Sequence, residues 1–169
     1  MITWKNAFYR GLLSGSLAAV SSALALIACG KLEKNAPVAP LNGPSQWVLG
    51  ERAAYRRRAS WRTVLGYGIH HLAAVGWGTF HEIAVAPWTA GQPFSRRMLG
   101  AAATSAVAFT ADYGIAKGRM QPGFEKHLGG VSLLIVYSAF AVGLAVLDSH
   151  ARPARSSTAH SAGRRSRPD

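Results

Sequence analysis

The sequence contains few acidic residues and a single cysteine. Among its 169 residues, 7 Asp and Glu stand against 19 Lys and Arg, and Cys29 is the only thiol. One cysteine excludes a framework of internal disulfides. Charged residues make up 15% of the chain, whereas an average soluble domain has about 25%. Because a soluble bundle needs a polar face along every helix, this scarcity of charge argues against that class.

The sequence also lacks the short motifs of common enzymes. It has no HExxH pair, nucleophile elbow, glycine-rich phosphate loop or CxxC. His81-Glu82 has no second histidine at the spacing of a metal site. A haem needs axial histidines from facing helices at one depth, and only one apolar segment carries histidines in its interior. We therefore predict no catalytic residues, no metal, no cofactor and no enzymatic activity.

Four long apolar segments dominate the rest of the chain. A bilayer core of ~30 Å is crossed by about 20 helical residues, and the segments match that length. They are Ala7–Cys29, Val64–Ala86, Leu99–Ala116 and Leu128–Leu147. The sequence predicts an all-α fold, a transmembrane four-helix bundle formed by residues 1–148. A disordered basic tail over residues 149–169 is expected to follow it.

Basic residues flank these segments and give the chain a net charge of +12. No nucleic-acid motif accompanies them, so we expect the cations to meet anionic lipid headgroups and not nucleic acid. The two sides of the predicted bundle carry nearly equal numbers of Lys and Arg, so the positive-inside rule gives little preference. We expect a multi-pass protein of a bacterial inner membrane with cytoplasmic termini.

The first loop divides into two parts. Prolines predict an irregular or extended chain over Lys31–Pro44. The stretch Gln46–Trp61 favours a short interfacial helix that buries aromatic residues and holds arginines at the headgroups. Its aromatic residues are Trp47 and Trp61, and its arginines are Arg56, Arg57 and Arg58. The alternative is a solvated basic loop.

Small residues recur at every fourth position of the first segment. Gly11, Gly15, Ala19 and Ala23 form this series, which allows close approach of another helix in a bilayer. The series suits either a homodimer face or packing within one bundle. Similar pairs on all four segments favour packing within the chain, and a homo-oligomer remains open.

The second segment carries most of the polar groups expected inside the membrane. His70 and His81 share one face, and His71 and Glu82 share a neighbouring face, each pair ~16 Å apart along the axis. Neither pair can therefore bind one metal ion. Ionisable groups in lipid are costly and face the bundle interior, so we expect this segment at the centre of the bundle.

The antiparallel arrangement suggests partners for these groups. Asp112 of the third segment lies at a depth where His71 or Tyr67 could bond to it, and Arg10 lies near the level of Glu82. One hypothesis is that such pairs are clasps that fix the register of the helices. The other is a proton or ion path, as in a small coupled transporter or channel, that uses His70, His71, Glu82 and Asp112.

The end of the first segment allows a second interpretation. A basic start, an apolar stretch and the sequence Leu26-Ile27-Ala28-Cys29 resemble the lipobox of bacterial lipoproteins. In that case the first segment would be cleaved and Cys29 lipidated. The alternative is an uncleaved helix that ends in Ala-Cys-Gly.

Three stretches resemble a group of small bacterial inner-membrane proteins of unknown function. They are Pro40-Leu-Asn42-Gly-Pro-Ser45-Gln-Trp47, the stretch from Ile69-His-His71 to His81-Glu82, and Asp112-Tyr113 with Pro122-Gly-Phe124-Glu125. The resemblance covers most of residues 7–147 and implies a four-helix membrane protein with no known activity. The sequence thus favours a structural or accessory membrane protein, with the coupled transporter as the alternative.

Overall fold

The computed structural model describes residues 3–147, and within this range all regular structure is helical. The prediction of an all-α fold is therefore confirmed. The predicted disordered tail, residues 149–169, lies outside the described residues.

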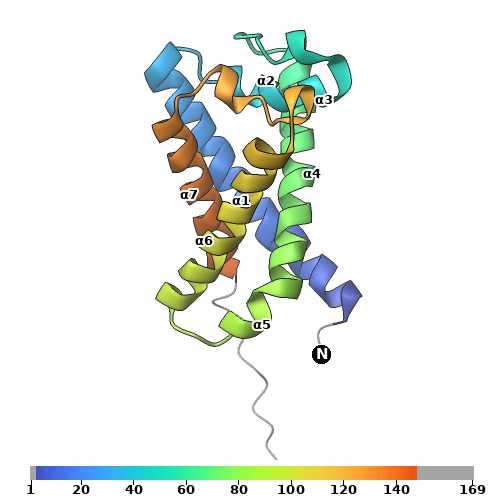
Figure 1. Ribbon diagram of the computed structural model, residues 1–169, viewed down its shortest axis with the longest axis vertical. Coiled ribbons are helices and arrows are strands. Elements are labelled where there is room, and N and C mark those ends of the chain that lie inside the picture. Colours follow the sequence, from blue (N-terminus) through green and yellow to red (C-terminus); the bar gives the residue numbers. More distant parts are fainter. Residues whose placement is uncertain (1–2, 148–169) are drawn as a thin grey trace, which may run out of the picture.

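Four long helices run up and down through the molecule (Figure 1). They are α1 (Trp4–Lys34), α4 (Trp61–Ala84), α6 (Phe94–Thr110) and α7 (Gly130–Leu147). A π-helical turn, η3 (Ala111–Ile115), extends α6. The described ends of the chain, at the start of α1 and the end of α7, lie at the same end of the molecule (Figure 1).

Local signals set the ends of these helices. The Ser60 hydroxyl accepts from the backbone N–H of Arg62, and the Thr63 hydroxyl accepts from the Ser60 N–H, which forms a capping box at the start of α4. Asn35 ends α1 in the left-handed conformation, with φ 49°. Asn tolerates this conformation better than most residues.

Short helical turns close one end of the bundle, and we call residues 36–60 and 116–129 the cap. The cap contains α2 (Ala39–Asn42), η1 (Gly43–Ser45), α3 (Gln46–Leu49), η2 (Glu51–Ala53), η4 (Gly118–Met120) and η5 (Phe124–Lys126). At the opposite end, α5 (Ala86–Thr89) joins α4 to α6 (Figure 1).

Two predictions for the first loop are wrong. Residues 39–45 are helical turns and not irregular chain, because Pro40 and Pro44 occupy first-turn positions, where no N–H is needed. The predicted helix Gln46–Trp61 is also absent, since α3 ends at Leu49. Gly50 then adopts φ 82°, a conformation that stops a helix.

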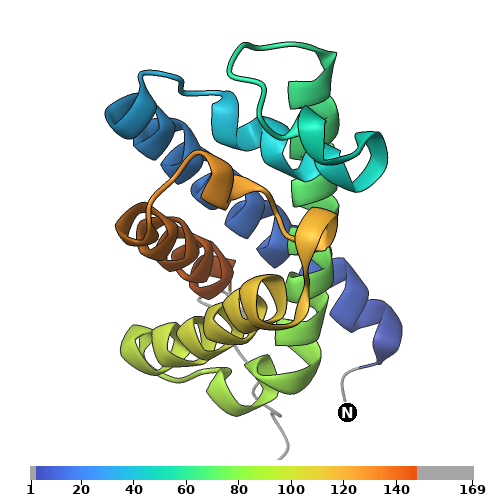
Figure 2. The ribbon, with the colours of Figure 1, turned by 45° about the horizontal axis from the view of Figure 1, so that its top comes forward.

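The first helix, and not the second, holds the bundle together. Figure 1 shows α1 running diagonally behind the other three helices. It packs along both α4 and α7, and α6 packs on α7, whereas α4 and α6 have few contacts with each other (Figure 2). The expectation that α4 would be central is therefore wrong.

The small residues of α1 allow this close packing. A Cβ on Gly15 would lie 2.5 Å from Val75 Cα, and one on Gly78 would lie 2.6 Å from Gly15 N. On the other side of α1, a Cβ on Gly143 would lie 2.5 Å from Ala18 Cα. The small-residue series therefore serves packing within the chain, as favoured from the sequence.

By length and composition, two helices of the described chain could cross a membrane, α1 and α7. Three histidines and Glu82 lower the hydropathy of α4, and α6 has only 17 residues. Two of the four predicted spans thus have the length and composition of a transmembrane helix, and the four-helix transmembrane bundle stays a prediction.

Candidate functional site: polar contacts and a cavity between the helices

An ion pair joins α1 to α4 at the end of the bundle where the chain begins. Arg10 Nε donates to Glu82 Oε2 over 2.7 Å. The Glu82 side chain is 1% exposed and the Arg10 side chain 33% exposed, so the carboxylate is buried while the guanidinium reaches the surface. The pair predicted from the sequence is thus present in the structure.

His70 and His71 follow each other in sequence but face different surroundings. His71 Nε2 lies 2.9 Å from the Ser16 hydroxyl of α1, and its Nδ1 lies 3.3 Å from the Tyr67 hydroxyl. His70 Nε2 lies 3.0 Å from the Ser22 hydroxyl. Both histidines therefore bridge α4 to α1, through serines whose part in the contacts the sequence analysis did not identify.

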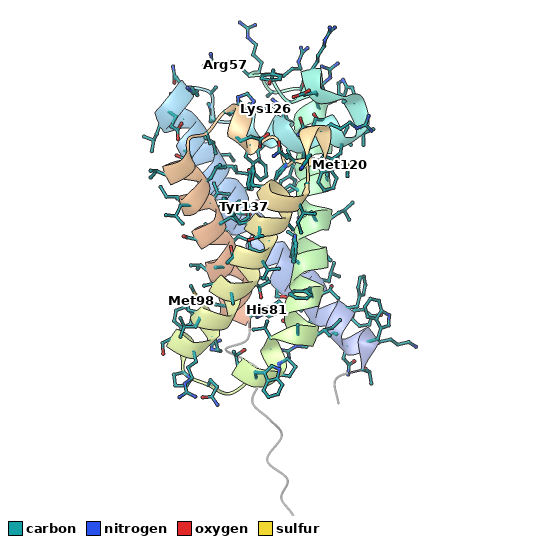
Figure 3. The ribbon with its side chains drawn as sticks, in the orientation of Figure 1. Arg57, His81, Met98, Met120, Lys126 and Tyr137 are labelled. Atoms are coloured by element: carbon teal, nitrogen blue, oxygen red, sulfur yellow. The ribbon has the colours of Figure 1, made fainter. Side chains whose placement is uncertain are left out.

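His81 connects α4 to α6. It is 1% exposed, and its Nδ1 lies 2.8 Å from the Thr104 hydroxyl oxygen. The Thr104 hydroxyl donates its own hydrogen bond to the carbonyl oxygen of Gly100, so its oxygen can accept a hydrogen bond from Nδ1–H of the imidazole. Figure 3 shows His81 inside the bundle, between these two helices.

Asp112 bonds to a residue that the sequence analysis did not consider. The Tyr137 hydroxyl of α7 donates to Asp112 Oδ2 over 2.5 Å. The predicted bonds from His71 or Tyr67 to Asp112 are therefore wrong. They failed because His71 faces α1, whereas Asp112 lies on the π turn beside α7.

A small cavity lies where the four long helices meet the cap. Its volume is about 50 Å³. Its lining combines five aromatic side chains with a few polar ones and small apolar residues: Ser22, Pro44, Trp47, Ile69, His70, Ala73, Ala74, Trp77, Ala108, Asp112, Pro122, Phe124, Val136, Tyr137 and Phe140. Of the predicted polar residues, His70 and Asp112 line the cavity, while Arg10, Tyr67, His71, His81 and Glu82 do not.

The residues predicted to lie at the membrane interface have different surroundings in the structure. Trp47 turns inward, where its indole N–H donates to the carbonyl oxygen of Gln121 over 3.0 Å. Trp61 is 62% exposed. Arg56, Arg57 and Arg58 are all exposed in the cap, and Figure 3 shows Arg57 on its outer surface.

Asn42 organises the cap, and the sequence analysis did not single it out. Its side-chain NH₂ donates to the carbonyl oxygens of Arg56 and Arg58, and its Oδ1 accepts from the Thr63 hydroxyl. The side chain is fully buried. The sequence signal for Asn42 was its position between Pro40 and Pro44, in one of the stretches that resemble small bacterial inner-membrane proteins.

His127 ties the two parts of the cap together. Its Nε2–H donates to the carbonyl oxygen of Ala54 over 2.6 Å. Burial lowers the pKa of His127, and the nearby charges of Arg57 and Lys126 act in the same direction, against the Ala54 hydrogen bond and Glu125. The imidazole is therefore held in the neutral form at neutral pH.

Cys29 lies in the middle of a packed surface. It is 4% exposed and contributes to a core cluster with residues of α1, α7 and the cap. Cleavage before Cys29 would remove most of α1, to which both α4 and α7 are packed. Lipidation at Cys29 and this fold are therefore mutually exclusive.

Among the described residues, no group of three or more His, Cys, Asp and Glu side chains could hold a metal ion. Comparison with protein-family models, with curated proteins and with solved structures finds no match.

Proposed function

We propose that the chain is a multi-pass inner-membrane protein with a structural or accessory role, in which buried polar side chains act as clasps between four membrane-embedded helices. The observation that carries this proposal is where polar and apolar side chains lie: large apolar side chains cover the outside of the bundle, and several polar side chains are buried inside it. Large apolar side chains are exposed on all four long helices, for example Leu24, Leu72, Leu99 and Leu134. Such a surface suits hydrocarbon better than water.

The buried side supports the same proposal. Polar side chains also bond to each other between helices: Arg10 with Glu82 between α1 and α4, and His81 with Thr104 between α4 and α6. The Ser21 hydroxyl of α1 donates to the carbonyl oxygen of Ala139 in α7. Polar groups in lipid need such partners, and these bonds would set the helix register.

The alternative, a coupled transporter, has less support. It requires His70, His71, Glu82 and Asp112 to act along one path. His70 and Asp112 line the cavity, whereas His71 and Glu82 bond to α1 outside its lining. His71 and Glu82 are also ~16 Å apart along α4, so the four residues do not line one path.

Membrane insertion can be tested by expressing the chain in bacteria and extracting the membranes with alkaline carbonate. An integral protein stays in the pellet, and reporter fusions at both ends should give the same, cytoplasmic, location. Recovery of the protein in the carbonate supernatant would reject the proposal. If the reporters at the two ends lie on opposite sides of the membrane, the four-span topology is rejected.

The accessory role is tested by flux in liposomes. Glu82→Gln should lower the unfolding temperature of the purified protein, while proton flux stays at the level of empty liposomes for the wild type, for Glu82→Gln and for Asp112→Asn. Wild-type flux above that level, lost in the two variants while they remain folded, would favour the transporter instead.

A further inference from the structure

The central cavity combines an aromatic wall with one acidic group. Trp47 comes from the cap, Trp77 from α4, Phe124 from the cap, and Tyr137 and Phe140 from α7. Aromatic faces carry negative charge density and attract cations, most effectively when several rings surround a dry site. The rings thus form a wall on several sides of one small space.

Asp112 is the only acidic residue of that lining, and it has no cationic partner. Among the described residues it accepts one side-chain hydrogen bond, from the Tyr137 hydroxyl, and the ion pairs involve Glu82 and Glu51 instead. This differs from Glu82, which is more deeply buried than the half-buried Asp112 and is paired with Arg10. An ionised carboxylate within an apolar cavity is costly unless a positive charge joins it.

The size of the cavity limits what that positive charge can be. One water-sized group needs ~10–15 Å³, so a cavity of about 50 Å³ accepts a ligand of only a few heavy atoms. Divalent metals need several charged or carbonyl oxygen ligands. The lining offers one carboxylate, and the described residues contain no group of three metal-ligating side chains.

From these observations we propose that the cavity is a binding site for a small ammonium cation, of the size of ammonium or methylammonium. The N–H groups of the ligand donate to the free carboxylate oxygen of Asp112, and the aromatic rings contact its charge and methyl group. This inference rests on the cavity alone and holds whether or not the helices serve an accessory role.

The test is calorimetric titration of the purified full chain in detergent with methylammonium chloride, against sodium chloride at the same ionic strength. Methylammonium should bind saturably and sodium should not, because sodium is strongly hydrated and too small to contact the rings. Equal responses to the two salts, or no saturable heat with methylammonium, would overturn the proposal.

Variants locate the site. Asp112→Asn keeps the shape and the bond from Tyr137, and should weaken methylammonium binding at least about tenfold, or ~1.4 kcal/mol. Glu51→Gln, the same change at an exposed acid of the cap, should leave binding unchanged. Ala73→Leu fills the cavity but retains Asp112, and should also abolish binding. Wild-type affinity in folded Asp112→Asn or in folded Ala73→Leu would show that the cavity is not the site.

Discussion

At the scale of single residues, the buried polar side chains differ in how far their removal would lower the free energy of unfolding. Glu82 is buried with a charged partner, whereas His71 and His70 bond to neutral serines. Removing one member of a buried ion pair leaves an uncompensated charge, which costs more than losing a neutral hydrogen bond. The Arg10–Glu82 pair is therefore where single substitutions should be most severe.

We predict that Arg10→Met destabilises the protein by ~3 kcal/mol, because Glu82 then stays buried without its guanidinium partner. Arg10→Met with Glu82→Leu should recover most of that loss, since both charges are removed together. Thermal or denaturant unfolding of the two variants in detergent measures the difference. Lys5→Met, an exposed cation on the same helix, is the control. A double variant as unstable as Arg10→Met would contradict the clasp.

At the scale of elements, backbone approach decides how α1 and α4 pack. Gly76 and Gly78 are two residues apart on α4, yet a Cβ on Gly78 would lie 2.7 Å from Gly15 Cα while one on Gly76 would meet nothing within 4 Å. The two positions differ in tertiary contact and share the same helical backbone. They therefore separate the packing effect from helix propensity.

We predict that Gly78→Ala lowers the free energy of unfolding by ~2 kcal/mol through overpacking against rigid backbone. Gly76→Ala should be neutral or stabilise by up to ~1 kcal/mol, because Ala favours the helix over Gly. Unfolding midpoints of both variants, measured side by side, check this. Equal effects of the two substitutions would mean that α1 and α4 are not in backbone contact.

For the whole molecule, the cap depends on contacts between segments far apart in the chain. His127 bonds to the Ala54 carbonyl, and Gln46 and Trp47 both donate to the Gln121 carbonyl. These bonds hold the first loop against the last one. The cap is therefore the part of the structure most sensitive to protonation of His127.

Acid should loosen this contact. The folded pKa of His127 lies below its ordinary value of 6.5, so as the pH falls below 6.5 the unfolded chain takes up a proton that the folded chain resists. Stability then decreases with falling pH. His127→Gln keeps a donor for Ala54 and should flatten the decrease in unfolding temperature between pH 7 and pH 5. The same slope in both proteins would contradict this assignment.

Periodicity and length were enough to predict the four helices and the Arg10–Glu82 pair. A helix repeats every 3.6 residues, so residues on one helix are placed relative to each other by the sequence. The helix ends were predicted less well, since α6 runs from Phe94 to Thr110 and not from Leu99 to Ala116. Four-residue spacing of Gly and Ala likewise marked the α1 surface that packs.

Only the tertiary structure decided the partner of Asp112, the inward turn of Trp47 and the fold of the cap. Asp112 bonds to Tyr137 because the π turn sets it beside α7, and Trp47 points inward because the Gln121 carbonyl and the cavity are there. These contacts depend on crossing angles between helices and on loops that meet after the bundle has formed. Local sequence determines the helices, whereas the relative placement of the helices determines which of their polar groups meet.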